Sequence, residues 1–77
     1  MHISSGPAVR LRKDVFVRRG QELGIDSDRA WAARLGVAPT TVTRLFADET
    51  KPGNGFIARA LRSIPNVNFD DLFEVVG

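Results

Sequence analysis

The chain has 77 residues, which is enough for one small domain with a single hydrophobic core and too few for two. Its 43% apolar and 26% charged residues are close to the averages of soluble globular proteins and argue against a disordered or fibrous chain, and the lack of cysteine excludes a disulfide framework and thiolate metal sites. No apolar run approaches the roughly 20 residues of a membrane-spanning helix, so we expect a cytoplasmic protein without membrane association.

The formal net charge of +2 is unevenly distributed along the chain. The segment from Arg10 to Arg62 holds all 11 basic residues and six of the nine acidic ones, whereas the residues beyond it carry three acids and no base. A basic body with an acidic end is typical of a protein that binds a polyanion, although most charged residues only solvate a surface.

The start of the chain predicts a leader followed by a helix. Residues 1–12 begin with the small, polar run MHISSGP, which indicates a flexible leader, and AVRL adds a short extended piece. A first helix is expected from Asp14, a good capping residue, to Leu23, with Gly24 as its stop. Gly20 lowers the helix propensity by about 1 kcal/mol relative to alanine, so tertiary packing must stabilise this helix.

Two short helices separated by a turn are predicted next. The first runs from Asp28 to Leu35 and is preceded by the capping residues of the run IDSD; Trp31 lies one turn before Leu35. Gly36 ends it. The second covers Pro39–Phe46 and begins with a proline, whose missing N–H costs nothing in the first turn of a helix.

The rest of the chain predicts a longer helix, a single turn and a strand. Asn54 is expected to cap a helix that continues to Ile64, and Asn68 to cap one further turn. The β-prone run FEVV, residues 73–76, is expected to pair with AVRL, residues 8–11, because each would otherwise be a lone strand.

The two short helices meet the conditions for placing the second of them against DNA. Ala32 supplies a small residue where the helices cross, and Gly36 can take the positive φ that the turn needs. Apolar residues at the required spacing hold the pair on the core, namely Trp31, Leu35, Val37, Val42 and Leu45. The exposed edge of the second helix carries Pro39, Thr40, Thr41, Thr43 and Arg44.

The run SDRAWAARLGVAPTTVTRLFADETKPGNGFIARALRS resembles the helix-turn-helix domains of the phage repressor and Cro type, the xenobiotic response element family, especially those of actinobacteria and their phages. The similarity extends from Asp14 to Phe73 and includes Pro52. It implies an all-α, compact five-helix domain of the lambda-repressor type over residues 13–77. Residues 39–46 would then be the recognition helix in the major groove.

The resemblance also implies which side chains touch DNA. Base contacts are expected from Pro39, Thr40, Thr43 and Arg44. An arginine can donate two hydrogen bonds to guanine, and a threonine can offer its hydroxyl or place its methyl group against that of thymine. Phosphate contacts are expected from Ser27, Arg29, Thr41, Lys51 and Asn54, and from an arm made of Arg10, Arg12 and Lys13.

The sequence departs from the family at two places near this surface. Asp28 stands where many members have a glutamine that reaches a phosphate, and a carboxylate would repel one unless it only caps the helix. Asp48 stands where a glycine usually follows the recognition helix; aspartate tolerates left-handed geometry but adds negative charge. Together with Glu49, it makes the closeness of this loop to DNA an open question.

These observations predict a sequence-specific regulator of transcription that binds double-stranded DNA as a homodimer on a pseudo-palindromic operator. The chain is too short for a separate ligand-sensing domain, so no small-molecule ligand and no cofactor is expected. We expect the dimer surface within residues 69–76. The alternative is a protein-interaction module, an antitoxin or anti-repressor, that keeps the helix-turn-helix scaffold and binds a basic partner through its acidic groups.

Other residues favour structural interpretations. Trp31 is expected in the core, and His2 has no second histidine or cysteine with which to form a metal site. Arg19 can bind a phosphate or form a salt bridge with Glu22 or Asp14. The acids Asp70, Asp71 and Glu74 lack an accompanying nucleophile, so no enzyme is expected.

Overall fold

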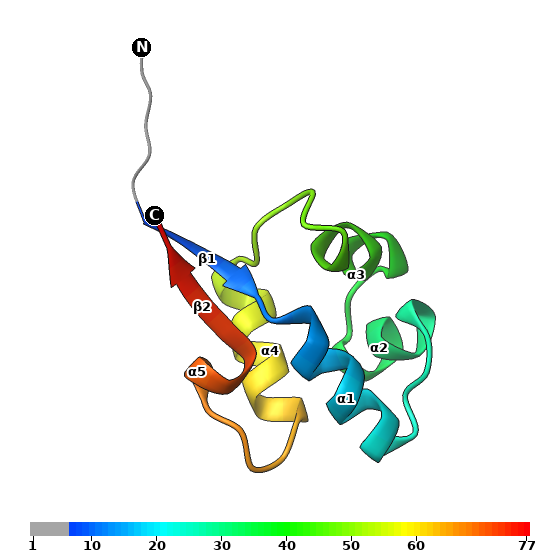
Figure 1. Cartoon of the computed structure of the whole chain (residues 1–77). Helices are drawn as coiled ribbons and strands as arrows, with labels where there is room; N and C mark the ends of the chain where they lie inside the picture. The colour runs from blue at the N-terminus through cyan, green and yellow to red at the C-terminus, as the bar shows by residue number, and fades with distance from the viewer. Residues whose placement is uncertain (1–6) are drawn as a thin grey trace.

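The computed structural model describes residues 7–77, so His2 lies outside the described residues. Five helices and two strands make up this part of the chain (Figure 1). In chain order they are β1 (Ala8–Leu11), α1 (Lys13–Leu23), α2 (Asp28–Leu35), α3 (Pro39–Phe46), α4 (Asn54–Ser63), α5 (Phe69–Leu72) and β2 (Phe73–Val76). None of the described helices has the length and apolar character needed to cross a membrane.

The two strands form an antiparallel pair that joins the two ends of the chain, as expected. Ala8 lies opposite Val76, and Leu11 lies opposite Phe73. The sheet and α5 lie at one side of the molecule and α3 lies at the other (Figure 1). The mostly helical architecture with a small sheet of the chain ends is therefore confirmed.

Helix α1 begins one residue before the predicted cap. Its N-cap is Arg12, and Asp14 is inside the first turn, so the prediction that Asp14 caps the helix is wrong. A carboxylate in the first turn still interacts favourably with the helix dipole. Gly20 is buried where α1 meets the next segment: a Cβ atom there would lie 2.7 Å from the carbonyl oxygen of Ile25. Glycine at this position lets α1 approach the rest of the core.

The boundaries of the remaining helices follow recognisable capping contacts. The backbone N–H of Ala30 donates to the Ser27 hydroxyl at 3.0 Å, which caps α2. Helix α4 has Gly53 as its N-cap and includes Asn54 as its first residue, so the prediction that Asn54 caps it is wrong. The Asn68 cap of α5 is confirmed, and its own N–H donates to the Asp71 carboxylate at 2.8 Å.

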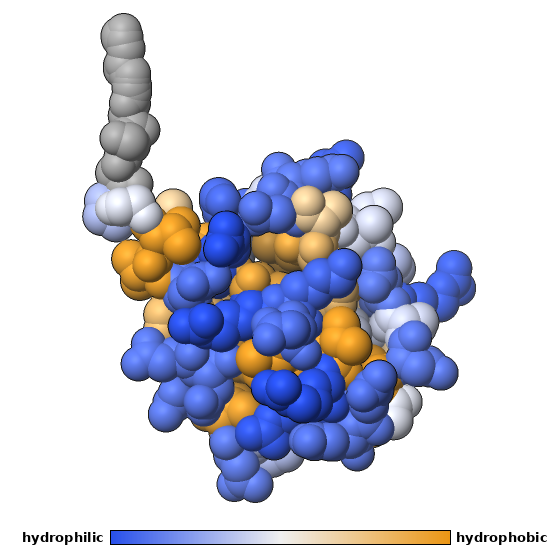
Figure 2. Space-filling view, viewed as in Figure 1, coloured by the Kyte–Doolittle hydropathy of each residue, from blue (hydrophilic) through white to orange (hydrophobic). Residues whose placement is uncertain are grey.

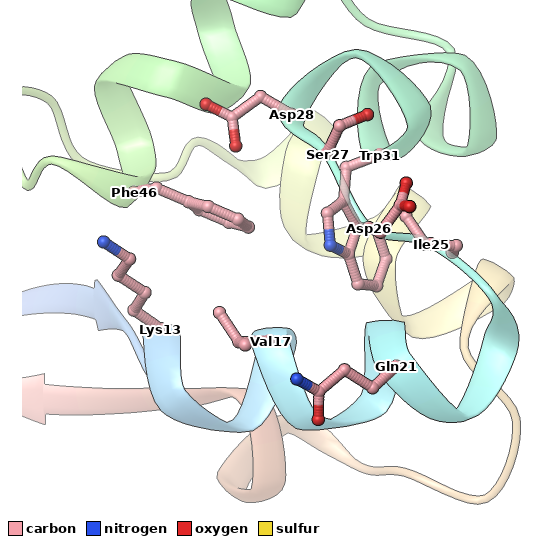
Figure 3. Close-up of a pocket in the computed structure, with 9 residues that line it drawn as sticks. All are labelled: Lys13, Val17, Gln21, Ile25, Asp26, Ser27, Asp28, Trp31 and Phe46. Carbon is pink, nitrogen blue, oxygen red and sulfur yellow. The ribbon is translucent and has the colours of Figure 1, made fainter.

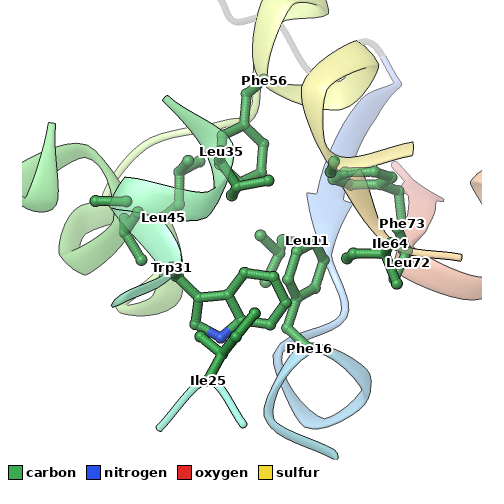
Figure 4. Close-up of a cluster of buried hydrophobic side chains, with 13 residues drawn as sticks. Leu11, Phe16, Ile25, Trp31, Leu35, Leu45, Phe56, Ile64, Leu72 and Phe73 are labelled. Carbon is green, nitrogen blue, oxygen red and sulfur yellow. The ribbon is translucent and has the colours of Figure 1, made fainter. Parts of the chain in front are cut away.

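The core is built around Phe16, which is fully buried. Its ring meets Trp31 edge-on with the ring centres 5.4 Å apart, and it stacks on Phe56 at 6.3 Å. Phe73 contacts the same ring from β2, so the sheet closes the core that the helices form (Figure 4). Only 2% of Trp31 is exposed, which confirms its predicted place in the core.

Residues 69–76, where the dimer surface was expected, expose less apolar surface than the sequence indicated. Phe73 is fully buried within its own chain, and Phe69 is half-buried and tilts against it with the ring centres 5.3 Å apart. Of the large apolar residues on β2, Val75 is the one that remains outside, with 66% of its surface exposed. Apolar surface is visible at this end of the molecule, beside the point where the chain ends meet (Figure 2).

Candidate nucleic-acid interface

Helix α3 has a buried side and an exposed side. Val42 is fully buried and Leu45 nearly so, and both anchor the helix to the core. Pro39, Thr40 and Arg44 are exposed on the helix. This division follows from the 3.6-residue period, which puts residues three or four apart on the same face. The predicted edge of α3 therefore does lie outside the globule.

The turn between α2 and α3 fixes the direction of α3. Gly36 takes the left-handed conformation with φ of 71°, and its N–H donates to the Ala32 carbonyl at 2.8 Å. Ala32 is buried in the core cluster, as a residue at a helix crossing must be. Arg59 donates to the Leu35 carbonyl at 3.2 Å and covers the turn so closely that a Cβ atom on Gly36 would lie 2.8 Å from its Nη1.

Two of the four predicted base-contacting side chains, Thr40 and Arg44, are exposed and have no side-chain hydrogen bond or ion pair within residues 7–77. An arginine in this state presents its five N–H donors to solvent. The guanidinium lies in the last turn of α3, where a cation also interacts favourably with the helix dipole. Of the four predicted base contacts, these two side chains have polar groups that are free to bond to a ligand.

The hydroxyl of Thr43, unlike that of Thr40, is hydrogen-bonded within the described chain, and the sequence did not indicate these bonds. Its hydroxyl oxygen lies 2.9 Å from Asp28 Oδ2 and 3.1 Å from the Pro39 carbonyl oxygen. A hydroxyl has a single hydrogen, so it donates to one of these acceptors at a time. Its methyl group and its lone pairs remain available, since the residue is exposed. Asp28 is thereby engaged with α3, and the cap of α2 is Ser27 instead.

The residues near α3 that were predicted to contact phosphates differ in their exposure and in their bonds within the chain. Ser27 uses its hydroxyl as an acceptor within the chain, whereas Arg29 and Asn54 are exposed and Thr41 is half-buried. Lys51 lies 3.5 Å from Asp48 in an exposed ion pair, which neutralises part of its charge.

The loop after α3 has the backbone geometry that the sequence suggested. Asp48 takes a positive φ of 60°, the conformation in which a glycine was expected. Its N–H donates to the Leu45 carbonyl at 3.1 Å, so the residue closes the end of α3. The carboxylate turns toward Lys51.

The three residues of the predicted basic arm, Arg10, Arg12 and Lys13, do not act together: the two arginines pair with a carboxylate and the lysine, within the described residues, does not. Arg10 donates through Nε and Nη2 to Glu74 Oε2 at 3.2 and 3.1 Å, and Arg12 Nη1 lies 3.7 Å from Glu74 Oε1. The strand register explains the first pair, because it puts Arg10 opposite Glu74. Lys13 is separate from both and borders a cavity next to α3.

The cavity next to α3 was not anticipated. It has a volume of about 250 Å³ and lies between α1, the start of α2 and the end of α3 (Figure 3). Its lining residues are Lys13, Val17, Gln21, Ile25, Asp26, Ser27, Asp28, Trp31 and Phe46. In sequence these residues belong to three separate segments, so no local pattern points to the cavity.

Two further observations bear on other functions. Arg19, left open between two roles, donates to Glu22 at 3.2 Å, so the salt bridge is present. Within residues 7–77, no three His, Cys, Asp or Glu side chains gather in a way that would hold a metal ion.

Comparisons of the chain with protein-family models, with curated proteins and with solved structures find no match. The geometry of α2 and α3 therefore carries the functional proposal.

Proposed function

We propose that the chain is a sequence-specific double-stranded DNA-binding regulator of transcription that places α3 in the major groove. One observation carries the proposal: α3 buries Val42 and Leu45 while Thr40 and Arg44 stand exposed on it. The major groove of B-DNA admits one helix, and side chains of these two types can read base edges there. The glycine turn at Gly36 and the buried Ala32 give α3 a fixed orientation, which base recognition requires.

The test begins with selection of bound sites from a random pool of duplex DNA. The selected site is then titrated with the wild-type chain and with Arg44→Ala, whose specific affinity should fall by about 1 to 3 kcal/mol if Arg44 reads a base. Arg62→Ala is the matched control, because Arg62 is also exposed but lies in the last turn of α4 and not on α3. Equal affinities of the two variants would show that α3 is not the reading helix.

A homodimer is part of this proposal. A single small module buries on the order of 600 to 1,000 Å² of protein surface on DNA, which is modest for tight binding. Two copies on a pseudo-palindrome would put their α3 helices about 34 Å apart. The exposed Val75 and the open edges of the β1–β2 sheet offer a surface for the second copy. Sedimentation that finds a monomer both free and on DNA would contradict the dimer.

The second candidate function is a protein-interaction module, and the ion pairs favour it. Lys51 pairs with Asp48, and Arg10 and Arg12 both lie at Glu74, so three predicted phosphate contacts are already opposed by carboxylates. A salt titration separates the candidates. DNA binding by phosphate contacts gives a log–log slope of about −0.9 per neutralised phosphate, whereas the interaction module shows no binding to DNA at moderate salt.

A further inference from the structure

Three arginines gather around a second hollow, which lies between the ends of α2 and α4. Arg59 and Arg62 are three residues apart on α4 and so share a face of that helix, and Arg34 borders the same hollow from α2. The hollow has a volume of about 260 Å³. No aspartate or glutamate is among the described residues that line it, so its surface carries a concentrated positive charge.

Backbone carbonyl groups hold two of these three guanidinium groups. Arg34 Nη2 donates to the carbonyl of Ser63, the last residue of α4, at 2.9 Å. Arg59 Nη1 donates to the carbonyl of Leu35, the last residue of α2, at 3.2 Å. A carbonyl is an uncharged acceptor, so each bond fixes the position of a guanidinium group without cancelling its charge. The hollow therefore has two cations held in place before any ligand arrives.

The positive charge of the hollow is not compensated within the described chain. None of the three arginines has an ion pair in residues 7–77, and Arg62 has no side-chain hydrogen bond there either. The negative end of a helix dipole favours one cation near each helix end. It does not explain why three cations share one hollow, because like charges repel at short distance. An anion bound between them would offset this repulsion.

The hollow lies at the opposite ends of α2 and α4 from the residues that were predicted to contact phosphates of DNA. Ser27 and Asn54 stand at the starts of these helices, whereas the carbonyls that hold the arginines belong to the last residues. Helices of eight and ten residues are about 12 and 15 Å long. We therefore treat the arginine hollow as a site separate from the predicted DNA surface.

We propose that this hollow binds a dianionic phosphate group, either free phosphate or the phosphate of a small monoester. Arginine suits this ligand because its planar fork donates two parallel hydrogen bonds to phosphate oxygens. Three cations favour a phosphate monoester, with a charge of about −1.5 to −2 at neutral pH, over a singly charged diester. The volume is below the roughly 300 Å³ at which pockets for drug-sized ligands begin, so the organic part of an ester is small.

The probes for this site are inorganic phosphate, phenyl phosphate and the diester methyl phenyl phosphate, each titrated by calorimetry into the whole chain at low salt. At least one of the first two should bind with saturation, and the diester should bind about tenfold more weakly or less than that. Phenyl phosphate that binds more tightly than inorganic phosphate identifies a monoester as the ligand, and the reverse order identifies free phosphate. A diester that binds as well as phenyl phosphate, or no saturable binding at all, would overturn the proposal.

The pH dependence of binding gives a second readout. Lowering the pH from about 8 to about 5 should weaken binding of phenyl phosphate, because the dianion takes up a proton near pH 6. Arginine stays charged over this range, so the change comes from the ligand. Affinity that stays constant over this range would mean that the hollow does not select the dianion, and would contradict the proposal.

Arg62→Gln is the deciding variant, because Arg62 makes no bond in the described chain whose loss would disturb the fold. It should weaken binding of phenyl phosphate about tenfold or more. Arg18→Gln is the matched control and should leave binding unchanged, since Arg18 is exposed on α1, has no ion pair in residues 7–77 and does not line the hollow. Thermal unfolding checks that both variants fold. Wild-type affinity of a folded Arg62→Gln, or an equal loss in both variants, would overturn the proposal.

Duplex binding separates a failure of this proposal from a failure of the proposed function. The site is independent of the proposed DNA binding, so Arg62→Gln should bind a selected duplex as tightly as the wild-type chain does. A duplex affinity that falls together with the affinity for phenyl phosphate would assign the arginines to the DNA surface and overturn the proposal of a separate site.

Discussion

The α3 side of the molecule and the β1–β2 sheet both carry arginines, but the chain treats them differently. On α3, Arg44 is exposed and free of intrachain ion pairs within the described residues. On the sheet, the guanidinium groups of Arg10 and Arg12 converge on the Glu74 carboxylate. The number of basic residues in a segment therefore does not measure the positive charge that the segment offers to a partner. The sheet mainly closes the core, whereas α3 keeps an exposed arginine that no carboxylate in the described residues opposes.

The first prediction concerns the role of the sheet in the core. Phe73→Ala should lower the free energy of unfolding by about 3 to 5 kcal/mol, because the ring is fully buried against Phe16 and its loss leaves a cavity. Urea unfolding measures this loss. Val75→Ala, on the same strand but exposed, is the control and should change stability little. Similar small losses for both variants would mean that the sheet is not part of the core.

The second prediction concerns the turn that orients α3. Gly36→Ala should destabilise the fold by roughly 1 to 2 kcal/mol, since the residue has a positive φ and a Cβ atom would crowd Arg59. Gly53→Ala is the matched control: its φ is −89° and a Cβ atom there meets nothing within 4 Å. Thermal unfolding of both variants gives the comparison. A Gly36→Ala variant as stable as Gly53→Ala would contradict the role given to the turn.

The third prediction concerns the link between α2 and α3. Thr43→Val removes the hydroxyl that donates to Asp28 and should cost about 0.5 to 1.5 kcal/mol of stability. Thr40→Val, at an exposed position without such a bond in the described chain, is the control for the change of side chain. Urea unfolding again provides the measurement. If the two variants lose the same amount, the Thr43 to Asp28 hydrogen bond does not stabilise the pair.

The smallest effect is expected at the ion pairs of the sheet. Glu74→Gln should change stability by less than about 1 kcal/mol, since the pairs with Arg10 and Arg12 are exposed to solvent. The same variant frees both guanidinium groups. If the sheet lies near DNA in the proposed complex, the salt dependence of binding should steepen by about 0.9 per added phosphate contact. An unchanged slope would place the sheet away from the DNA.

Much of the fold follows from the sequence because its signals are local. Pro39 begins α3 and Gly36 ends α2 because of their backbone restrictions, and Asn68 as a cap identified a helix of a single turn. The first residues of α1 and α4 were predicted one residue late, because Asp14 and Asn54 are favourable both as caps and inside a first turn. The place of such a residue in the sequence does not distinguish these two roles.

The candidate surface was only partly predictable, because side-chain pairing depends on tertiary structure. The exposed face of α3 follows from helical periodicity. The bond from Thr43 to Asp28 requires the crossing angle of α2 and α3, which no pattern within one helix contains. The opposition of Arg10 and Glu74 was within reach, since the pairing of the two strands was expected and only the register was missing.

The left-handed backbone at Asp48 gives the loop after α3 a further property. Glycine adopts this conformation without steric cost, so an aspartate there keeps a small strain together with a carboxylate that restrains Lys51. Exchange for glycine would relax the backbone and release the lysine in one step. Under the proposed function, such a protein would bind any duplex more tightly and distinguish its own site less well, because Lys51 would be free to contact a phosphate.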